Sequence, residues 1–216
     1  MTLLGPREKA YVQNELSELS RAVELVLFSD GVSEASRALE ELAAEMADAV
    51  PELSVRTELP EGEEAERFGI EGRVPALALV PEGDGDGPAN GIRFFGFPGG
   101  YEFNSLLDAI RRVANADPGV DPELLGELLA LQEPLHLQVF VTPSCPYCPR
   151  MVQLAHRMAL ASPLVRGDMV DATEFPKLAD LYGVQGVPLT VINGRPAITG
   201  LVPEHRMAAE LRKQGR

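Results

Sequence analysis

The chain has 216 residues, of which 45% are hydrophobic and 24% are charged, so it is long enough to bury a substantial core. Its 33 acidic and 19 basic side chains give a net charge of −14, which disfavours partnership with nucleic acid or anionic membranes. Two cysteines allow neither a multi-disulfide scaffold nor a zinc site with four cysteine ligands, and we expect no metal and no cofactor.

The location of the protein is indicated by two further patterns. No apolar run approaches the roughly 18 residues of a membrane span. The N-terminus, Met1–Lys9, lacks the basic segment and apolar core of a signal peptide. We therefore expect a cytoplasmic protein without a membrane partner. The charge is uneven, because residues 1–118 carry 10 basic and 23 acidic side chains, whereas residues 119–216 carry 9 and 10.

In the first half, apolar periodicity and turn residues predict alternating helices and strands. They are a helix 6–19, a strand 22–28, a helix 34–49 capped by Ser33, a strand 53–59 with Leu53, Val55 and Thr57 on one face, a helix 61–68, a strand 76–80, a Gly/Asp/Pro-rich loop 82–91, a strand 92–95 and a helix 101–115.

The second half gives a similar succession. It comprises a helix 122–131 capped by Asp121, a strand 135–141, a helix 146–161, a strand 164–170, a helix 174–182, a strand 189–192, a turn at Asn193-Gly194, a strand 196–199 and a helix 203–213. A break at Asp117-Pro118-Gly119 separates the two successions.

The two cysteines, Cys145 and Cys148, have Cys-x-x-Cys spacing between a predicted strand and a predicted helix. This arrangement is typical of a thioredoxin-type dithiol or disulfide. Cys145 lies before the first helical turn, whose free N–H groups and dipole favour a thiolate and lower the thiol pKa below about 8.5. We expect Cys145 to attack a substrate disulfide and the more covered Cys148 to resolve the mixed disulfide.

A repeat relates the two halves. Val139 lies 113 residues after Val26, and Val187-Pro188 lies 113 residues after Val74-Pro75. The chain is therefore predicted to be α/β, with two tandem thioredoxin-fold units, each a central mixed β-sheet flanked by helices. The predicted units are 1–118, without a Cys-x-x-Cys, and 119–216, with the redox-active Cys-Pro-Tyr-Cys. At the same offset, the cysteine motif falls on Val32–Ala35, so the first unit carries no thiol.

Residues around the cysteines are expected to support substrate binding. Pro146 and Tyr147 lie between the cysteines and carry no charge, which predicts a pair more oxidising than that of thioredoxin. Its potential would be roughly −200 to −230 mV if the glutaredoxin range applies. Val187-Pro188 precedes a strand, in the position where thioredoxin folds carry a cis-proline facing the dithiol, so a substrate chain can pair with the backbone of Val187.

Other polar residues suggest little chemistry. We expect His136, His156 and His205 to serve surface or packing roles, and Asp168 and Asp171 to cap a strand end and remain solvated. Thioredoxin has a buried aspartate beneath its disulfide that assists proton transfer, but the comparable position near Val139 is apolar here. Water, or a residue that the pattern does not identify, must then accept that proton.

Several motifs resemble the glutaredoxin-like protein disulfide oxidoreductases, which have two thioredoxin-fold units. These motifs are Phe97–Phe103, Asp121–Leu131, Thr142–Pro149, Ala155–Ala159, Gly167–Val170 and Tyr182–Pro188. The resemblance implies disulfide exchange with protein substrates and electrons from a thioredoxin-reductase-like flavoprotein. Members of that family usually carry Cys-x-x-Cys in both units, so this chain departs from them in its first unit.

That departure favours an alternative. The chain is also similar to the N-terminal domain of the flavoprotein of alkyl hydroperoxide reductase, in which only the second of two thioredoxin folds is active; it would then pass electrons to a peroxiredoxin. Glutathione-dependent chemistry is less favoured, because Gly200–Pro203 lacks the Gly-Gly pair of glutaredoxins. A third possibility is a non-catalytic tandem-fold docking protein.

Overall fold

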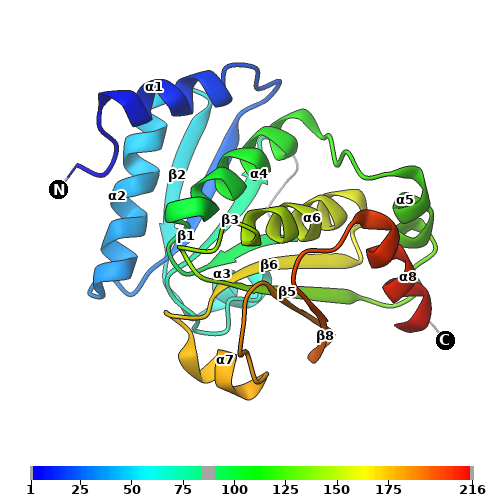
Figure 1. The fold of residues 1–216 in the computed structure, drawn as a ribbon. Helices are drawn as coiled ribbons and strands as arrows, with labels where there is room; N and C mark the ends of the chain where they lie inside the picture. Colours follow the sequence, from blue (N-terminus) through cyan, green and yellow to red (C-terminus); the bar gives the residue numbers. More distant parts are fainter. Residues whose placement is uncertain (1, 84–90, 215–216) are drawn as a thin grey trace.

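A single mixed β-sheet runs through the molecule (Figure 1). The computed structural model describes residues 2–83 and 91–214. In these ranges the sheet has eight strands in the order β2-β1-β3-β4-β6-β5-β7-β8. The predicted α/β class is confirmed, while the stretch 84–90 of the predicted loop lies outside the described residues.

The elements agree with the predicted ones to within two residues, except that the first helix ends four residues early. The strands are β1 Val23–Phe28, β2 Leu53–Glu58, β3 Ala76–Pro81, β4 Ile92–Phe95, β5 Leu135–Val141, β6 Val165–Asp171, β7 Leu189–Ile192 and β8 Arg195–Thr199. The helices are α1 Pro6–Glu15, α2 Glu34–Ala49, α3 Glu63–Phe68, η1 Gly100–Glu102, α4 Phe103–Asn115, α5 Pro122–Leu129, α6 Cys148–Ala161, α7 Pro176–Leu181 and α8 Glu204–Gln214. None of these described helices is long and apolar enough to cross a membrane.

The sheet repeats its own strand order. The sets β2-β1-β3-β4 and β6-β5-β7-β8 each contain one parallel pair followed by two antiparallel pairs. The sets join where β4 pairs in parallel with β6, with Ile92 opposite Gly167 and Phe95 opposite Val170. The repeat that the sequence predicts is therefore visible as two matched halves of one continuous sheet. A boundary between units near residues 117–121 remains a proposal.

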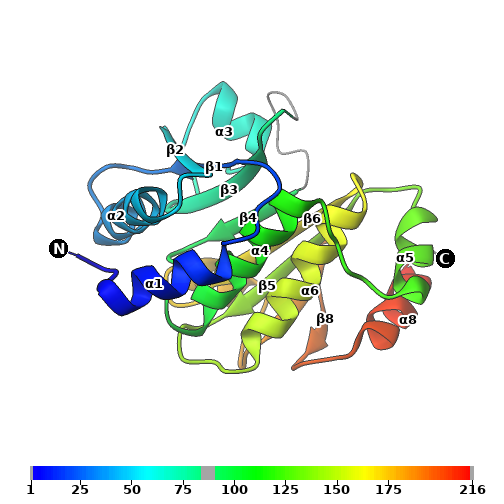
Figure 2. The same ribbon diagram turned by 90° about the horizontal axis from the view of Figure 1, so that it is seen from above.

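Alternate residues of the strands face two separate cores, as the period of a strand requires. Leu25 and Leu27 of β1 belong to the larger core, which lies beneath α1, α2, α4, α5, α6 and α8. Val26 and Phe28 belong to the smaller core, which α3 and α7 cover. Figure 2 shows α4 of the first half and α6 of the second side by side over the sheet.

The strand β2 differs from the prediction in its burial. The sequence pattern places Leu53, Val55 and Thr57 on one face, but only Leu53 is buried. The reason is the position of β2 at the edge of the sheet, where it pairs with β1 alone. An edge strand has neighbours on one side only, so alternation alone overestimates its buried surface.

A buried ion pair links the two halves at the β4–β6 junction. Arg93 of β4 lies directly opposite Asp168 of β6, and its Nε and Nη2 atoms donate to the two carboxylate oxygens at 2.8 and 3.0 Å. Both side chains are at most 2% exposed. Arg93 Nη1 also donates to the carbonyl oxygens of Phe68 and Gly69. All three nitrogen atoms of the buried guanidinium therefore have hydrogen-bond acceptors.

The expectation that Asp168 caps a strand end in solvent is therefore wrong. Burial alone would raise the pKa of Asp168, but the charge of Arg93 and a 2.6 Å contact with His136 Nε2 lower it to about 2. Asp171 does act as a cap, since its Oδ1 accepts from the N–H and hydroxyl of Thr173, but it is buried rather than solvated.

The Asp168→Asn variant should lose about 3–5 kcal/mol of unfolding free energy, because it leaves the Arg93 charge buried without its counter-charge. Urea unfolding at neutral pH measures this loss. The matched control is Arg212→Ala, which breaks the exposed pairs of Arg212 with Glu123 and Glu127 and should cost less than about 1 kcal/mol. Equal effects of the two substitutions would contradict a structural role for the buried pair.

Candidate redox site

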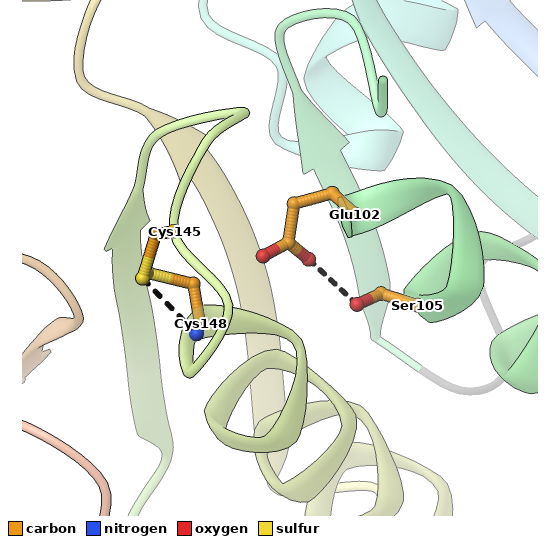
Figure 3. Close-up of a disulfide and its surroundings, with 4 residues drawn as sticks. All are labelled: Glu102, Ser105, Cys145 and Cys148. Carbon is orange, nitrogen blue, oxygen red and sulfur yellow. Dashed lines mark hydrogen bonds between the residues drawn. A yellow bond between two sulfur atoms is a disulfide. The ribbon is translucent and has the colours of Figure 1, made fainter. Parts of the chain in front are cut away.

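Cys145 and Cys148 form a disulfide between the end of β5 and the start of α6 (Figure 3). The turn between these elements is held by the Cys145 N–H group, which donates to the carbonyl oxygen of Thr142 at 3.1 Å. The predicted placement of the cysteines between a strand and a helix is thus confirmed. No other cysteine exists in the chain, so any thiol chemistry must use this pair.

The two sulfur atoms occupy different environments. Cys145 is 7% exposed and Cys148 is fully buried. The backbone N–H of Cys148, the first residue of α6, donates to Cys145 Sγ at 3.2 Å. The N-terminus of a helix carries partial positive charge, so this contact stabilises a thiolate at Cys145 more than a thiol.

Both prolines of the repeated Val-Pro motif follow a cis peptide bond, at Val74-Pro75 and at Val187-Pro188. The strand β7 begins immediately after Pro188 and runs antiparallel to β5, with Leu189 opposite Phe140. Pro188 therefore lies at the same end of the sheet as the cysteine turn. Val187 packs against the core that contains both cysteines.

A buried carboxyl group from the first half faces the disulfide. Figure 3 shows the side chain of Glu102, at the end of η1, directed toward Cys145 and Cys148. Glu102 is 1% exposed, and its Oε2 accepts from the hydroxyl of Ser105 at 2.6 Å. Its Oε1 has no hydrogen-bond partner among the described residues. Burial, and to a smaller extent the charge of Asp171, raise the pKa of Glu102 to about 7.

The segment after β4 carries Glu102 across to the second half. Its first residue, Gly96, donates its N–H to the carbonyl oxygen of Pro75, and Phe97 donates its N–H to Glu174 Oε1 at 2.7 Å. Farther along, the Tyr101 N–H donates to the carbonyl oxygen of Pro143 at 3.2 Å.

Gly100 is required at this crossing. It has a φ of +59°, and a Cβ atom there would lie 2.3 Å from the carbonyl oxygen of Pro143. A larger residue would push η1 away from the cysteine turn.

Sequence reasoning missed Glu102 because it looked for the acid on the strand that precedes the cysteines. Val139 at that position is indeed buried and apolar. The available signal was an acidic residue at the start of the predicted amphipathic helix 101–115, within the Phe97–Phe103 motif. Only the fold shows that this segment reaches the disulfide.

In the first half, the segment that corresponds to the cysteine motif is a capped loop. Asp30 Oδ1 accepts from the N–H groups of Val32 and Ser33, and these hydrogen bonds lower the pKa of Asp30 to about 2. Ser33 Oγ accepts from the Ser36 N–H, which confirms the predicted cap of α2. The loop therefore has a structural explanation without any chemistry.

None of the three histidines has a contact that indicates a catalytic role at the disulfide. His136 contacts the buried ion pair, and His205 is exposed on α8. His156 is buried, with Nε2 3.3 Å from the Arg93 carbonyl oxygen, and burial lowers its pKa to about 4. Within the described ranges, no group of three or more His, Cys, Asp or Glu side chains is arranged to hold a metal ion.

Comparison with known proteins agrees with this geometry. Residues 135–213 match a family model described as a thioredoxin domain. The alkyl hydroperoxide reductase F protein of Staphylococcus aureus is 28% identical over 192 residues, or 89% of this chain. The corresponding protein of Staphylococcus epidermidis is 27% identical over 193 residues. The chain spans only 34% of the length of these curated relatives.

Two solved structures are similar over nearly the whole chain. A protein disulfide oxidoreductase from Aeropyrum pernix has a TM-score of 0.86 and 26% identity, with 98% of this chain and 93% of that chain covered. The NTD_N/C domain of the Enterococcus faecalis alkyl hydroperoxide reductase AhpF has a TM-score of 0.86 and 28% identity, with 96% and 99% covered. The chain therefore has the tandem thioredoxin fold of these structures, with a thioredoxin-like Cys-x-x-Cys disulfide in its second half.

The Glu102→Gln variant should be more stable than the wild type at pH 8. The unfolded carboxyl group loses its proton near pH 4.5, whereas the folded one keeps it until about pH 7, so wild-type stability falls as pH rises between these values. Above pH 7 the cost is on the order of 3 kcal/mol, which glutamine removes. Urea unfolding at pH 5 and pH 8 measures the difference.

The control for this experiment is Glu133→Gln, which changes an exposed glutamate and should leave stability unchanged at both pH values. A Glu102→Gln variant that gains no stability between pH 5 and pH 8 would mean that the Glu102 carboxyl group titrates normally in the folded protein.

Proposed function

We propose that the chain exchanges disulfides with protein substrates, with Cys145 as the attacking thiol and Cys148 as the resolving thiol. The observation that carries the proposal is the 3.2 Å contact from the Cys148 N–H to Cys145 Sγ at the start of α6. It favours negative charge on Cys145, which is also the more exposed of the two. Cys148, which is fully buried, is suited to attack within the mixed disulfide rather than to meet a substrate.

The reaction needs two proton-coupled steps. The Cys145 thiolate attacks one sulfur of a substrate disulfide, forms a mixed disulfide and releases one substrate thiolate, which takes a proton from solvent. Cys148 then loses its proton to the Glu102 carboxylate and attacks Cys145 Sγ. This closes the Cys145–Cys148 disulfide and releases the second substrate thiolate. Two electrons have passed from the chain to the substrate, and a dithiol or flavoprotein reductant restores them.

Glu102 is suited to accept the proton of Cys148. Its pKa of about 7 leaves it largely ionised slightly above neutral pH yet basic enough to receive a proton. Its Oε1 has no other described partner and lies on the side of the disulfide (Figure 3). The proton acceptor that the strand at Val139 lacks is therefore supplied by η1 of the first half.

The substrate is proposed to bind around the cis-proline. Pro146 and Tyr147 form the outer part of the cysteine turn, and Tyr147 is 63% exposed. Val187 and Pro188 lie at the same end of the sheet, at the start of β7. An extended substrate segment would pair with the Val187 backbone while its disulfide meets Cys145.

A second candidate function is electron donation to a peroxiredoxin. It is supported by the similarity to the alkyl hydroperoxide reductase F protein over 89% of this chain and by a first half without cysteines. In that role, a thioredoxin-reductase-like flavoprotein would reduce Cys145–Cys148, and the dithiol would reduce the peroxiredoxin disulfide. The dithiol chemistry is the same as above, and only the partners differ.

The Cys145→Ser variant should reduce neither insulin nor a purified peroxiredoxin, because the attacking thiolate is lost. Cys148→Ser should accumulate a mixed disulfide through Cys145, visible as a mass increase under non-reducing conditions. Turnover of both substrates is followed with excess dithiothreitol as reductant, whereas the mixed disulfide is trapped by adding substrate to reduced Cys148→Ser after the dithiothreitol has been removed.

In the same assays, a much larger kcat/KM for the peroxiredoxin than for insulin would select the second candidate. Retention of full turnover by Cys145→Ser, or trapping through Cys148 instead, would contradict the assigned roles.

A further inference from the structure

Three of the large exposed hydrophobic side chains are attached to backbone segments next to the disulfide. Among the described residues, nine such side chains are exposed, and Tyr101, Tyr147 and Leu201 are three of them. Tyr147 belongs to the cysteine turn itself. The backbone of Tyr101 is hydrogen-bonded to the cysteine turn, and Leu201 follows a residue that is hydrogen-bonded to the cis-proline. Clustered exposed apolar side chains are typical of surfaces that bind other proteins.

Tyr101 comes from the first half. Its N–H donates to the carbonyl oxygen of Pro143, two residues before Cys145, and Gly100 fits closely against that same oxygen. These backbone contacts fix the position of residue 101 beside the cysteine turn. The Tyr101 side chain is nevertheless 49% exposed, so the fold brings the ring there without using it to fill the core.

The other two side chains come from the second half. Tyr147 lies between the cysteines. Leu201, which is 38% exposed, follows Gly200, whose N–H donates to the carbonyl oxygen of Pro188 at 2.8 Å. Leu201 also lines a hollow of about 480 Å³ together with Arg150 and Leu154 of α6. The hollow is also lined by the charged Arg157 and Glu204. The three exposed side chains, which we call the rim, are thus attached to η1, to the cysteine turn and to the segment after β8.

We propose that Tyr101 is a docking residue for protein disulfides, so that the first half supplies part of the substrate-binding surface of the second. This inference rests on the proposed disulfide exchange. The partner is an extended protein segment with apolar side chains next to its disulfide. The cysteine turn favours such a segment because Pro143, Ser144, Pro146 and Tyr147 carry no charge, although the whole chain has a net charge of −14.

Tyrosine suits this role because a rigid amphipathic ring gives a large contact area at low entropic cost. A small disulfide reaches Cys145 without touching Tyr101, whereas a protein segment must cross the rim. Loss of the Tyr101 side chain should therefore raise the KM for protein substrates and leave kcat unchanged.

The experiment compares insulin with 2-hydroxyethyl disulfide as substrates of the full chain, with dithiothreitol as reductant. In Tyr101→Ala, the KM for insulin should rise about fivefold or more, the effect of losing an interface contact of about 1 kcal/mol, with kcat unchanged. Turnover of 2-hydroxyethyl disulfide should stay within about twofold of the wild type, since the backbone bond to Pro143 remains.

Two further variants separate docking from structure. Tyr101→Phe should keep most of the insulin affinity, and Leu129→Ala, which removes a 69% exposed side chain from α5, should behave as the wild type. An unchanged insulin KM in Tyr101→Ala overturns the proposal, and so does an equal loss on both substrates. A change from dimer to monomer in Tyr101→Ala would assign the residue to self-association instead. Absence of wild-type turnover on both substrates would refute the proposed function itself.

Discussion

The parallel pairing of β4 with β6 is the constraint on which the site depends. It makes the edge of one half continuous with the edge of the other, and the buried Arg93–Asp168 pair lies within this junction. The segment that follows β4 must then leave the sheet beside the second half. It does so as η1, which brings Glu102 to the disulfide and the Tyr101 backbone to Pro143. Without the β4–β6 junction, Glu102 would not face the cysteine pair.

The first half has no cysteine, but it contributes residues to the surroundings of the disulfide. Its counterpart of the cysteine motif is a loop organised by Asp30 and a helix cap at Ser33. The first half also contributes Glu102, whose side chain faces the disulfide. Burial makes the Glu102 carboxyl group costly to ionise and raises its pKa. We interpret the tandem fold as a division of labour in which one half carries the electrons and the other supplies the proton acceptor.

Local patterns predicted most of the fold. Proline and cap residues such as Ser33 and Asp121 mark helix starts, and the 113-residue repeat predicted the tandem arrangement. The strand and helix patterns on either side of the cysteines predicted the place of Cys145. The failures concern long-range contacts. Arg93 and Asp168 are 75 residues apart and look like ordinary charges until the strands pair. Glu102 lies 43 residues before Cys145, and no periodicity indicates that a segment of one half completes the site of the other. The roles of Cys145, Cys148, Pro146, Tyr147, Val187 and Pro188 remain predictions that rest on their geometry.

The central claim is that a carboxyl group of the first half serves the dithiol of the second. The most direct measurement is a carbon-13 NMR titration of the Glu102 side chain in the oxidised and reduced full chain. The account predicts a pKa of about 7 in the oxidised protein, and a change in that titration when the disulfide is reduced and Cys148 becomes a neighbouring acid. A titration near 4.5 that is the same in both redox states would contradict the account.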